Sequence, residues 1–314
     1  MMKKLVWFLI IITVTSVFSS CDKTEPEGKE PGEKPRVVVA SKIDTEGTLL
    51  GNMILLMLRK NGFVAVDNLS FGPTDVVRRA IINGEFDIYP EYTGNGAFFF
   101  DQAESAVWKN PEEGYRTVKD LDYRANRLVW LTPAPANNTW AVCVRKDVAE
   151  EHGLVTLEDL AAYIHEGGYF KLAGSEEFAG RPDALPAFEA AYGFKLSEDQ
   201  LLILSGGNTA QTEQAAARET EGVNAAMAYG TDGQLSALGL VVLEDSLNIQ
   251  PVYEPTPVVR EDILKAHPEI ESILKPVFES LDLVTLQTLN ASISVEGRNA
   301  AEVAEEYLKA QGFL

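Results

Sequence analysis

The fold of this chain is decided by the stretch RVVVASKIDTEGTLLGNMILLMLRKNGFVAV, residues 36–66. It opens on a run of valines at residues 37–39, which is typical of a strand buried on both faces. Residues 45–60 follow with apolar side chains at helical spacing, and Gly62 stops the helix. Residues 63–66 return to a strand pattern. This strand–helix–strand order predicts a parallel sheet with a right-handed crossover.

The alternation of strands and helices continues along the chain. A second helix is expected at residues 74–82, and a third short strand at 86–89, which we expect Pro90 to end. Further strand patterns occur at residues 128–131, 140–145, 225–229 and 241–243. Helix patterns between and after them give two α/β units, so the fold class is α/β. Ligands in such sheets bind outside the carboxyl ends of the strands, often between domains.

The composition excludes several classes of function. With 314 residues, the chain has room for two cores of about 100–150 residues each. Its formal net charge is −20, from 27 Lys and Arg against 47 Asp and Glu, so we expect no nucleic-acid partner. Three histidines and two cysteines offer little for a metal site, and we expect neither a metal nor a cofactor. The GxSxG, HExxH, GxGxxG, P-loop and CxxC motifs are missing from the sequence, so we expect no enzyme.

The N-terminal residues have the pattern of a targeting signal. Lys3 and Lys4 precede an apolar run at residues 5–14, which is too short to span a bilayer and predicts a signal peptide. Small residues then precede Cys21, an ending that resembles a bacterial lipobox. We therefore expect a lipoprotein signal peptide at 1–20, and a lipidated Cys21 with a flexible tether over 21–35. The alternative is an ordinary secreted protein that is cleaved nearby, with Cys21 incidental.

Aromatic residues fall at the predicted ends of strands and in the loops beside them. Tyr92 follows a Pro-containing turn, Trp140 opens a strand, and Tyr229 closes one. Tyr253 lies in a loop between prolines. Taken singly, each of these rings is more often core packing than a ligand contact. Their spacing alone does not assemble them into one site.

The motifs around these aromatics closely resemble those of the osmoprotectant-binding family. The matching motifs are SK at 41–42 with TE at 45–46, DIYPEYTG at 87–94, NNTW at 137–140, YGTDG at 229–233 and PVY at 251–253. Members of this family are substrate-binding proteins of ABC importers for glycine betaine, choline, carnitine and related compounds. The resemblance covers nearly all of the chain from residue 36 to residue 314.

This resemblance implies a type II periplasmic-binding-protein fold, in which two α/β lobes joined by a hinge close on a ligand in the cleft between them. Lobe one would comprise residues 36–141 plus 247–314, and lobe two residues 142–246. We expect a monomeric, extracytoplasmic, membrane-anchored receptor that delivers a quaternary ammonium compound to ABC permease subunits. Two alternatives remain open: a sensory module for the same compounds, and a lipid-anchored hydrolase, for which the sequence offers no nucleophile motif.

The family's aromatic box would be formed here by Tyr92, Trp140, Tyr229 and Tyr253. A quaternary ammonium carries a positive charge but no N–H, so it is held by the negative faces of aromatic rings. Trp140 stands where tyrosine is common in the family, and tryptophan is the stronger cation–π partner.

The polar end of the ligand would meet a second set of residues. Lys42 and Arg181 match family positions that hold a carboxylate, Arg181 through a two-pronged hydrogen bond. Asn138 would lie near the ligand, and Glu177 would orient or offset Arg181. Asn95 falls where relatives often have threonine, and Gly47 falls where many have glutamine. These features place glycine betaine first among the expected ligands, with choline or carnitine next.

Overall fold

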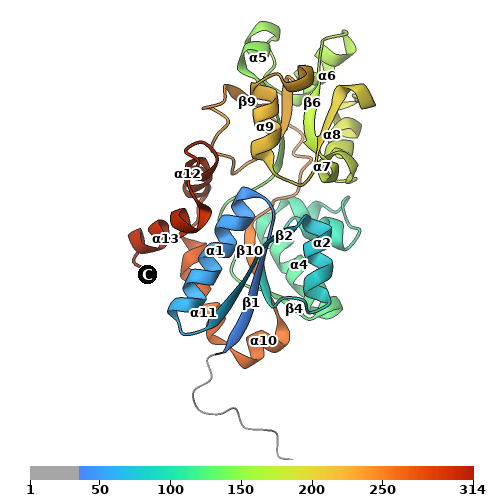
Figure 1. The fold of residues 1–314 in the computed structure, drawn as a ribbon. Helices are drawn as coiled ribbons and strands as arrows, with labels where there is room; N and C mark the ends of the chain where they lie inside the picture. The colour runs from blue at the N-terminus through green and yellow to red at the C-terminus, as the bar shows by residue number, and fades with distance from the viewer. Residues whose placement is uncertain (1–34) are drawn as a thin grey trace, which may run out of the picture. The chain divides into compact units, whose positions relative to one another are not determined.

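The computed structural model describes residues 35–314, which form two five-stranded sheets (Figure 1). The first sheet has the order β2-β1-β3-β10-β4. Its strands are β1 (Arg36–Lys42), β2 (Val64–Gly72), β3 (Ile88–Tyr92), β4 (Leu128–Trp130) and β10 (Pro255–Arg260). β1 pairs in parallel with β2 and β3, whereas β10 returns from late in the chain and runs antiparallel to β3 and β4.

The second sheet is formed by the middle of the chain, in the order β7-β6-β8-β5-β9. Its strands are β5 (Trp140–Arg145), β6 (Leu172–Ser175), β7 (Leu201–Leu204), β8 (Ala225–Tyr229) and β9 (Leu240–Val242). β6 lies parallel to β7 and β8, and β5 runs antiparallel to β8 and β9. We call the elements built on the first sheet the first lobe and those built on the second sheet the second lobe. The two sheets confirm the expected α/β class.

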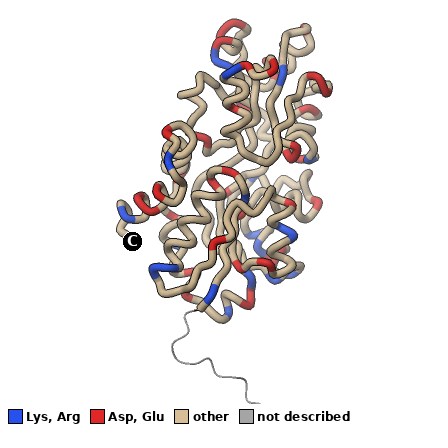
Figure 2. The backbone as a smooth tube through the Cα atoms, in the orientation of Figure 1, with Lys and Arg blue, Asp and Glu red and all other residues tan. Residues whose placement is uncertain are grey.

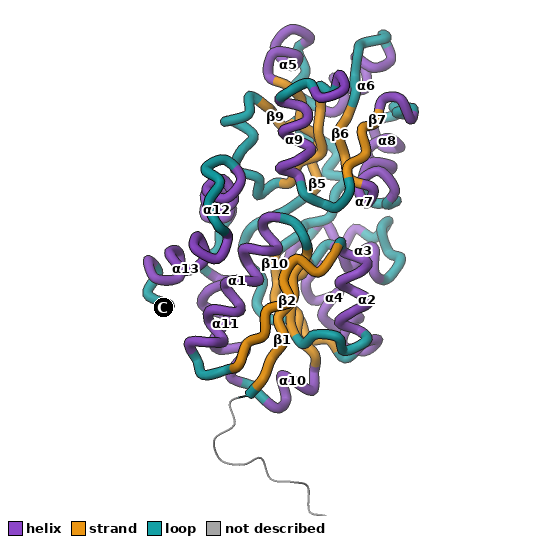
Figure 3. The backbone as a smooth tube through the Cα atoms, in the orientation of Figure 1, coloured by secondary structure: helices purple, strands orange, loops and turns teal. Residues whose placement is uncertain are grey.

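Helices cover the first sheet on two sides (Figure 3). One side carries α1, α10, α11, α12 and α13, with bounds Thr45–Lys60, Glu261–Ala266, Glu269–Glu279, Leu283–Ser294 and Ala300–Ala310. The other side carries α2, α3, the short η1 and α4, with bounds Thr74–Ile82, Asn95–Phe99, Ala106–Lys109 and Pro111–Asn126. Each side buries its own apolar cluster against the valines of β1, which explains the continuous apolar run in that strand.

The second lobe is smaller and is packed around aromatic side chains. Its helices are α5 (Lys146–His152), α6 (Leu157–His165), α7 (Glu176–Gly180), α8 (Leu185–Tyr192), α9 (Thr209–Ala217) and the short η2 (Glu198–Gln200) and η3 (Thr220–Gly222). Phe170, Phe178 and Phe188 form the centre of its core together with Leu160 and Leu172. Cys143 is buried in β5 as an unpaired thiol.

One expectation about β3 is wrong: the strand does not end at Pro90 but runs through it to Tyr92. Pro90 lies opposite Pro257 of the antiparallel strand β10. Because a proline has no N–H to donate, placing two prolines opposite each other removes the need for ladder bonds from either residue. The extra length of β3 brings Glu91 and Tyr92 into the strand, where every residue is buried.

Charged residues of both signs are interspersed along the described chain (Figure 2). Arginines gather on α2 and α4, and four of them, Arg78, Arg79, Arg116 and Arg124, form ion pairs with carboxylates of the same two helices. These four arginines are therefore neutralised by neighbouring acids, which disfavours a role for them in binding a polyanion.

Candidate functional site

A single pocket is lined by all nine residues that the sequence suggested for ligand contact. They are Lys42, Tyr92, Asn95, Asn138, Trp140, Glu177, Arg181, Tyr229 and Tyr253. The pocket holds about 450 Å³ of space free of protein atoms, including the part that is open to solvent. Ile43, Asp44, Pro73, Thr74 and Gly207 complete its lining. The lining residues come from both lobes, so the pocket lies where the two lobes meet.

The four aromatic rings are positioned by the ends of strands in both sheets. Trp140 begins β5 and lies opposite Tyr229, the last residue of β8. Their ring centroids are 4.8 Å apart. Tyr92 ends β3 in the first lobe, and Tyr253 lies just before β10. Tyr92, Trp140 and Tyr253 are each at least nine-tenths buried, which leaves only one face or edge of each ring for a ligand.

Gly94 allows Tyr253 to reach this position. A Cβ atom at residue 94 would lie 2.8 Å from both the Tyr253 ring and the carbonyl oxygen of Val252. Such an approach is shorter than van der Waals contact, so a larger residue would push Tyr253 out of place. The glycine of the DIYPEYTG motif thus permits close packing between β3 and the loop that carries Tyr253.

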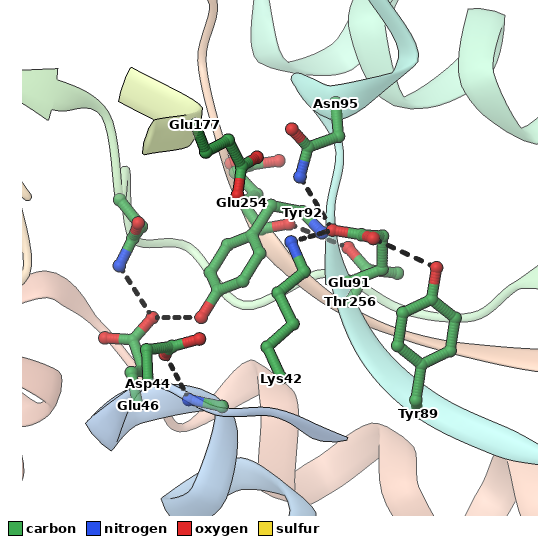
Figure 4. Close-up of polar contacts among 12 residues, drawn as sticks. Lys42, Asp44, Glu46, Tyr89, Glu91, Tyr92, Asn95, Glu177, Glu254 and Thr256 are labelled. Carbon is green, nitrogen blue, oxygen red and sulfur yellow. Dashed lines mark hydrogen bonds and ion pairs between the residues drawn. The ribbon is translucent and has the colours of Figure 1, made fainter. Parts of the chain in front are cut away.

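Lys42 lies at the end of β1 and is already paired within the pocket. Its Nζ donates to Oε1 of Glu91 at 2.6 Å and lies 4.8 Å from the centre of the Tyr92 ring (Figure 4). Glu91 is fully buried and also accepts hydrogen bonds from the Tyr89 hydroxyl and from Nδ2 of Asn95, at 3.0 and 2.7 Å. The sequence analysis did not assign Glu91 to the site.

Arg181 follows α7 in the second lobe and contacts groups in both lobes. Its Nε and Nη2 donate to the two carboxylate oxygens of Asp183, at 2.9 and 2.6 Å. Its Nη1 donates to Glu177 at 2.7 Å and to Oδ1 of Asn95, in the first lobe, at 2.9 Å. The ring of Phe98, also in the first lobe, lies 4.3 Å from Cζ. The two-pronged side of the guanidinium is thus occupied by Asp183, which the sequence analysis did not include.

Two further carboxylates lie at the start of α1. Asp44 is the N-cap of the helix and accepts the N–H of Gly47 at 2.7 Å, and burial raises its pKa. Glu46 accepts hydrogen bonds from the Tyr92 hydroxyl and from Asn138, both at 3.0 Å. Burial raises the pKa of Glu46 to about 7. Gly47, at the position where the resemblance led us to expect glutamine, supplies the backbone N–H that the Asp44 cap accepts.

Carboxylates outnumber cations around the pocket. The cations are Lys42 and Arg181, whereas the carboxylates in or next to the pocket are Asp44, Glu46, Glu91, Glu177 and Asp183. A pocket with more carboxylates than cations concentrates positive charge in a low-dielectric setting. Such a site suits a ligand that bears a permanent cation.

Comparison with known proteins identifies the chain. Residues 35–310 match the family model for the substrate binding domain of the ABC-type glycine betaine transport system. The chain belongs to this family. It is therefore a substrate-binding protein of ABC transport and not an enzyme, and it acts outside the cytoplasm.

Relatives agree with this assignment. The glycine betaine-binding protein YehZ of Escherichia coli (strain K12) is 60% identical over 277 residues, which cover 88% of this chain and 91% of that protein. A glycine-betaine-binding protein of Pseudomonas aeruginosa is 31% identical over 282 residues, with 88% of each chain covered. A crystal structure of a glycine betaine/carnitine/choline ABC transporter protein shares the fold, with a TM-score of 0.68 at 22% identity, and covers 88% of this chain and 99% of its own. The fold is therefore the two-lobe periplasmic-binding-protein fold.

The N-terminal expectations concern residues that the structure does not describe. The signal peptide, Cys21 and most of the tether all lie outside residues 35–314. Within those residues, no helix has both the length and the apolar character needed to cross a membrane. Lipidation of Cys21 therefore stays a prediction of the sequence.

Asp232 supports the backbone at Tyr229, one of the aromatic residues that line the pocket. Its carboxylate accepts the N–H of Tyr229 at 2.6 Å and the hydroxyl of Thr209 at 3.0 Å. Glu213 is fully buried, and burial together with the charge of Asp232 raises its pKa. Asp232 thus holds the end of β8, and with it Tyr229, in place.

Proposed function

We propose that this protein captures a small quaternary ammonium compound, glycine betaine first and choline or carnitine next, through a cation–π box. It passes the ligand to the membrane subunits of an ABC importer and is held at the membrane by a lipid on Cys21. The observation that carries the proposal is the convergence of Tyr92, Trp140, Tyr229 and Tyr253 on one pocket that is rich in carboxylates.

The chemistry of a trimethylammonium head group matches the aromatic residues that line the pocket. A trimethylammonium group cannot be held by hydrogen-bond acceptors, because its nitrogen carries no hydrogen. Aromatic faces attract it instead, and each desolvated contact contributes up to about 2 kcal/mol. The surrounding acids add a longer-range attraction for the same charge.

The carboxylate of glycine betaine has two candidate partners. Lys42 uses one of its three ammonium hydrogens on Glu91, so its other hydrogens can turn to a ligand. Arg181 lines the pocket while it is anchored by Asp183. The E. coli and P. aeruginosa relatives are both named glycine betaine-binding proteins, and this supports the proposal of glycine betaine ahead of choline.

Closure of the lobes would complete the capture. Arg181 of the second lobe bonds to Asn95 of the first, and Asn138 bonds to Glu46 of the first lobe and to Thr231 of the second. A ligand that contacts both lobes stabilises the arrangement in which these bonds are made. Binding then shifts an equilibrium between open and closed states, with no bond broken.

Calorimetric titration of residues 22–314 tests the proposal. The ligands are glycine betaine, choline, carnitine and proline. We expect saturable binding of at least one trimethylammonium compound, with proline much weaker. If none of the four ligands releases or absorbs heat on saturation, the box serves another ligand and the substrate assignment fails.

Arg181→Ala should change the selectivity of the pocket. Without the guanidinium, Asp183 and Glu177 lose their counter-ion. The carboxylate of glycine betaine would then face like charges, whereas choline has none to repel. A lost charge-assisted hydrogen bond is worth about 1.5–3 kcal/mol, so glycine betaine should lose about 10–150-fold more affinity than choline.

Titration of both ligands into the variant and the parent measures this ratio. Arg145→Ala is the matched control, because Arg145 also pairs with two carboxylates but lies outside the pocket lining. It should leave the ratio unchanged. Equal losses for glycine betaine and choline in Arg181→Ala would show that Arg181 acts only through the structure.

A further inference from the structure

Glu46 is a buried carboxylate that lies behind the pocket and does not line it. It is 4% exposed and belongs to the first turn of α1. Its Oε1 accepts from the Tyr92 hydroxyl and from Nδ2 of Asn138, both at 3.0 Å (Figure 4). Its Oε2 accepts from Nδ2 of Asn290 in α12, at 2.7 Å. One side chain therefore joins α1, β3, the segment between the lobes and a C-terminal helix.

The hydrogen-bond donors to Glu46 are all neutral. Asn138 and Asn290 both bond onward to Thr231, at Oγ1 and at the carbonyl oxygen respectively. No lysine or arginine pairs with the Glu46 carboxylate in the described chain. When ionised, Glu46 is thus a negative charge held in the interior without a counter-ion, and burial raises its pKa to about 7.

The charged and titratable groups that face Glu46 come from each neighbouring element. Asp44, at the start of the same helix, repels it. Tyr92 of β3 bonds to it, and Lys42 of β1 lies over the Tyr92 ring while bound to Glu91. Asp232 follows Thr231 on the second lobe, and α12 presents only the neutral Asn290. None of these groups supplies a fixed cation to the Glu46 carboxylate.

We propose that Glu46 is a positioning residue that couples capture of the cation to release of a proton. Its carboxylate accepts the Tyr92 hydroxyl and so places a negative charge at the hydroxyl end of the ring that meets the ligand. The proposal deepens the function proposed above and rests on it, because it requires Tyr92 to be a wall of the cation site.

The coupling follows from the charges. A bound cation favours ionised Glu46, so its carboxyl proton leaves to solvent on binding and the ligand itself is unchanged. The pKa of Glu46 is about 7 in the empty protein and must fall in the complex. Affinity for a cation therefore rises as the pH rises through about 7, by up to about tenfold between pH 6 and pH 8.

Asn290 gives a reason to expect that E46Q folds. Its Oδ1 is buried with no hydrogen-bond partner among the described residues. Rotation of this amide lets Oδ1 accept from the amide that E46Q introduces. The variant keeps the shape of Glu46 and its bond from Tyr92, and it removes the charge and the titration at the cost of the neutral bond from Asn290 to the carbonyl oxygen of Thr231.

The experiment is calorimetric titration of the protein with choline at several pH values from 6 to 8. Each titration is run in two buffers with different ionisation enthalpies, which reports the number of protons released. A second titrant is 3,3-dimethylbutan-1-ol, the neutral isostere of choline. E254Q is the matched control, because Glu254 also has a raised pKa but, among the described residues, forms hydrogen bonds through its backbone only and holds no ring of the pocket.

We expect choline to release up to about half a proton at pH 7 and up to about one proton at pH 6, because a carboxyl group with a pKa of about 7 is half protonated at pH 7. The neutral isostere should release fewer protons. E46Q should bind choline with an affinity that no longer rises through this range, and E254Q should behave like the parent. Y92F removes a hydrogen bond that lowers the pKa of Glu46, so it should move the proton release to higher pH.

The outcomes separate this inference from the function on which it rests. If neither choline nor glycine betaine binds, the proposed function fails. If choline binds with no proton release, or if E46Q still releases the proton, the role of Glu46 is overturned. Should E46Q fail to fold, equal proton release by choline and its neutral isostere in the parent protein would overturn it instead.

Discussion

Asp122→Ala is expected to lower the free energy of unfolding by about 3–5 kcal/mol. Asp122 is fully buried and forms a two-pronged ion pair with Arg78, with N–O distances of 2.7 and 2.6 Å. It also accepts the indole N–H of Trp130 at 2.7 Å and a bond from Asn126 at 2.8 Å. Removing it leaves a buried guanidinium without a partner, and that uncompensated charge accounts for most of the cost.

Urea denaturation followed by circular dichroism measures this change. The double variant Arg78→Met/Asp122→Leu should recover much of the loss, because it removes both charges and fills the space with apolar atoms. Glu112→Ala breaks the exposed pair with Arg116 and should change stability by less than about 1 kcal/mol. If Asp122→Ala were as mild as Glu112→Ala, the ion pair would not be a main support of the packing between α2 and α4.

The sheets, and the positions of the aromatic residues at the ends of strands, could be predicted because their sequence signals are local. The valine run at 37–39 reads directly as a buried strand, and the spacing of residues 45–60 reads as a helix. Tyr92 and Tyr229 could be expected at the ends of strands, although each ring taken singly is more often core packing than a ligand contact. Assembling them with Trp140 and Tyr253 needed the family resemblance.

The partners of the charged residues could not be predicted from local patterns. Lys42 meets Glu91 across 49 positions of sequence, and Glu46 meets Asn290 across 244. A buried carboxylate has the same local appearance as a solvated one, and with 47 acids in the chain no local pattern assigned Glu46 or Asp183 to the site. Only the folded structure shows which carboxylates are buried away from solvent.

The error at Pro90 has the same origin. A proline is a sound reason to end a strand when only its own segment is considered, because it removes a ladder donor. The strand continues here because β10 presents another proline at the opposite position. That pairing joins residues far apart in the chain, so it becomes visible only when β10 is seen between β3 and β4.

The aromatic box gives the second large effect: Trp140→Ala should weaken binding of a trimethylammonium ligand by about 1–3 kcal/mol, or about 5–150-fold. Trp140 is 5% exposed, and its ring packs 5.2 Å from Phe178 and 4.8 Å from Tyr229, measured between centroids. Truncation removes a cation–π face and also loosens the support of Tyr229, so both losses act on the same ligand group.

Calorimetric titration with glycine betaine and choline measures the loss, and thermal unfolding shows how much of it reflects stability. Trp140→Phe keeps an aromatic face with a weaker quadrupole and should fall between the parent and the alanine variant. Trp130→Phe is the control for a buried tryptophan outside the pocket: it should cost stability through its bond to Asp122 and leave the Kd unchanged. A Trp140→Ala protein with the parent's Kd would remove this ring from the ligand site. Tyr229, which lies opposite Trp140, would then have to contact the cation without it. That result would contradict the proposed box of four aromatic rings.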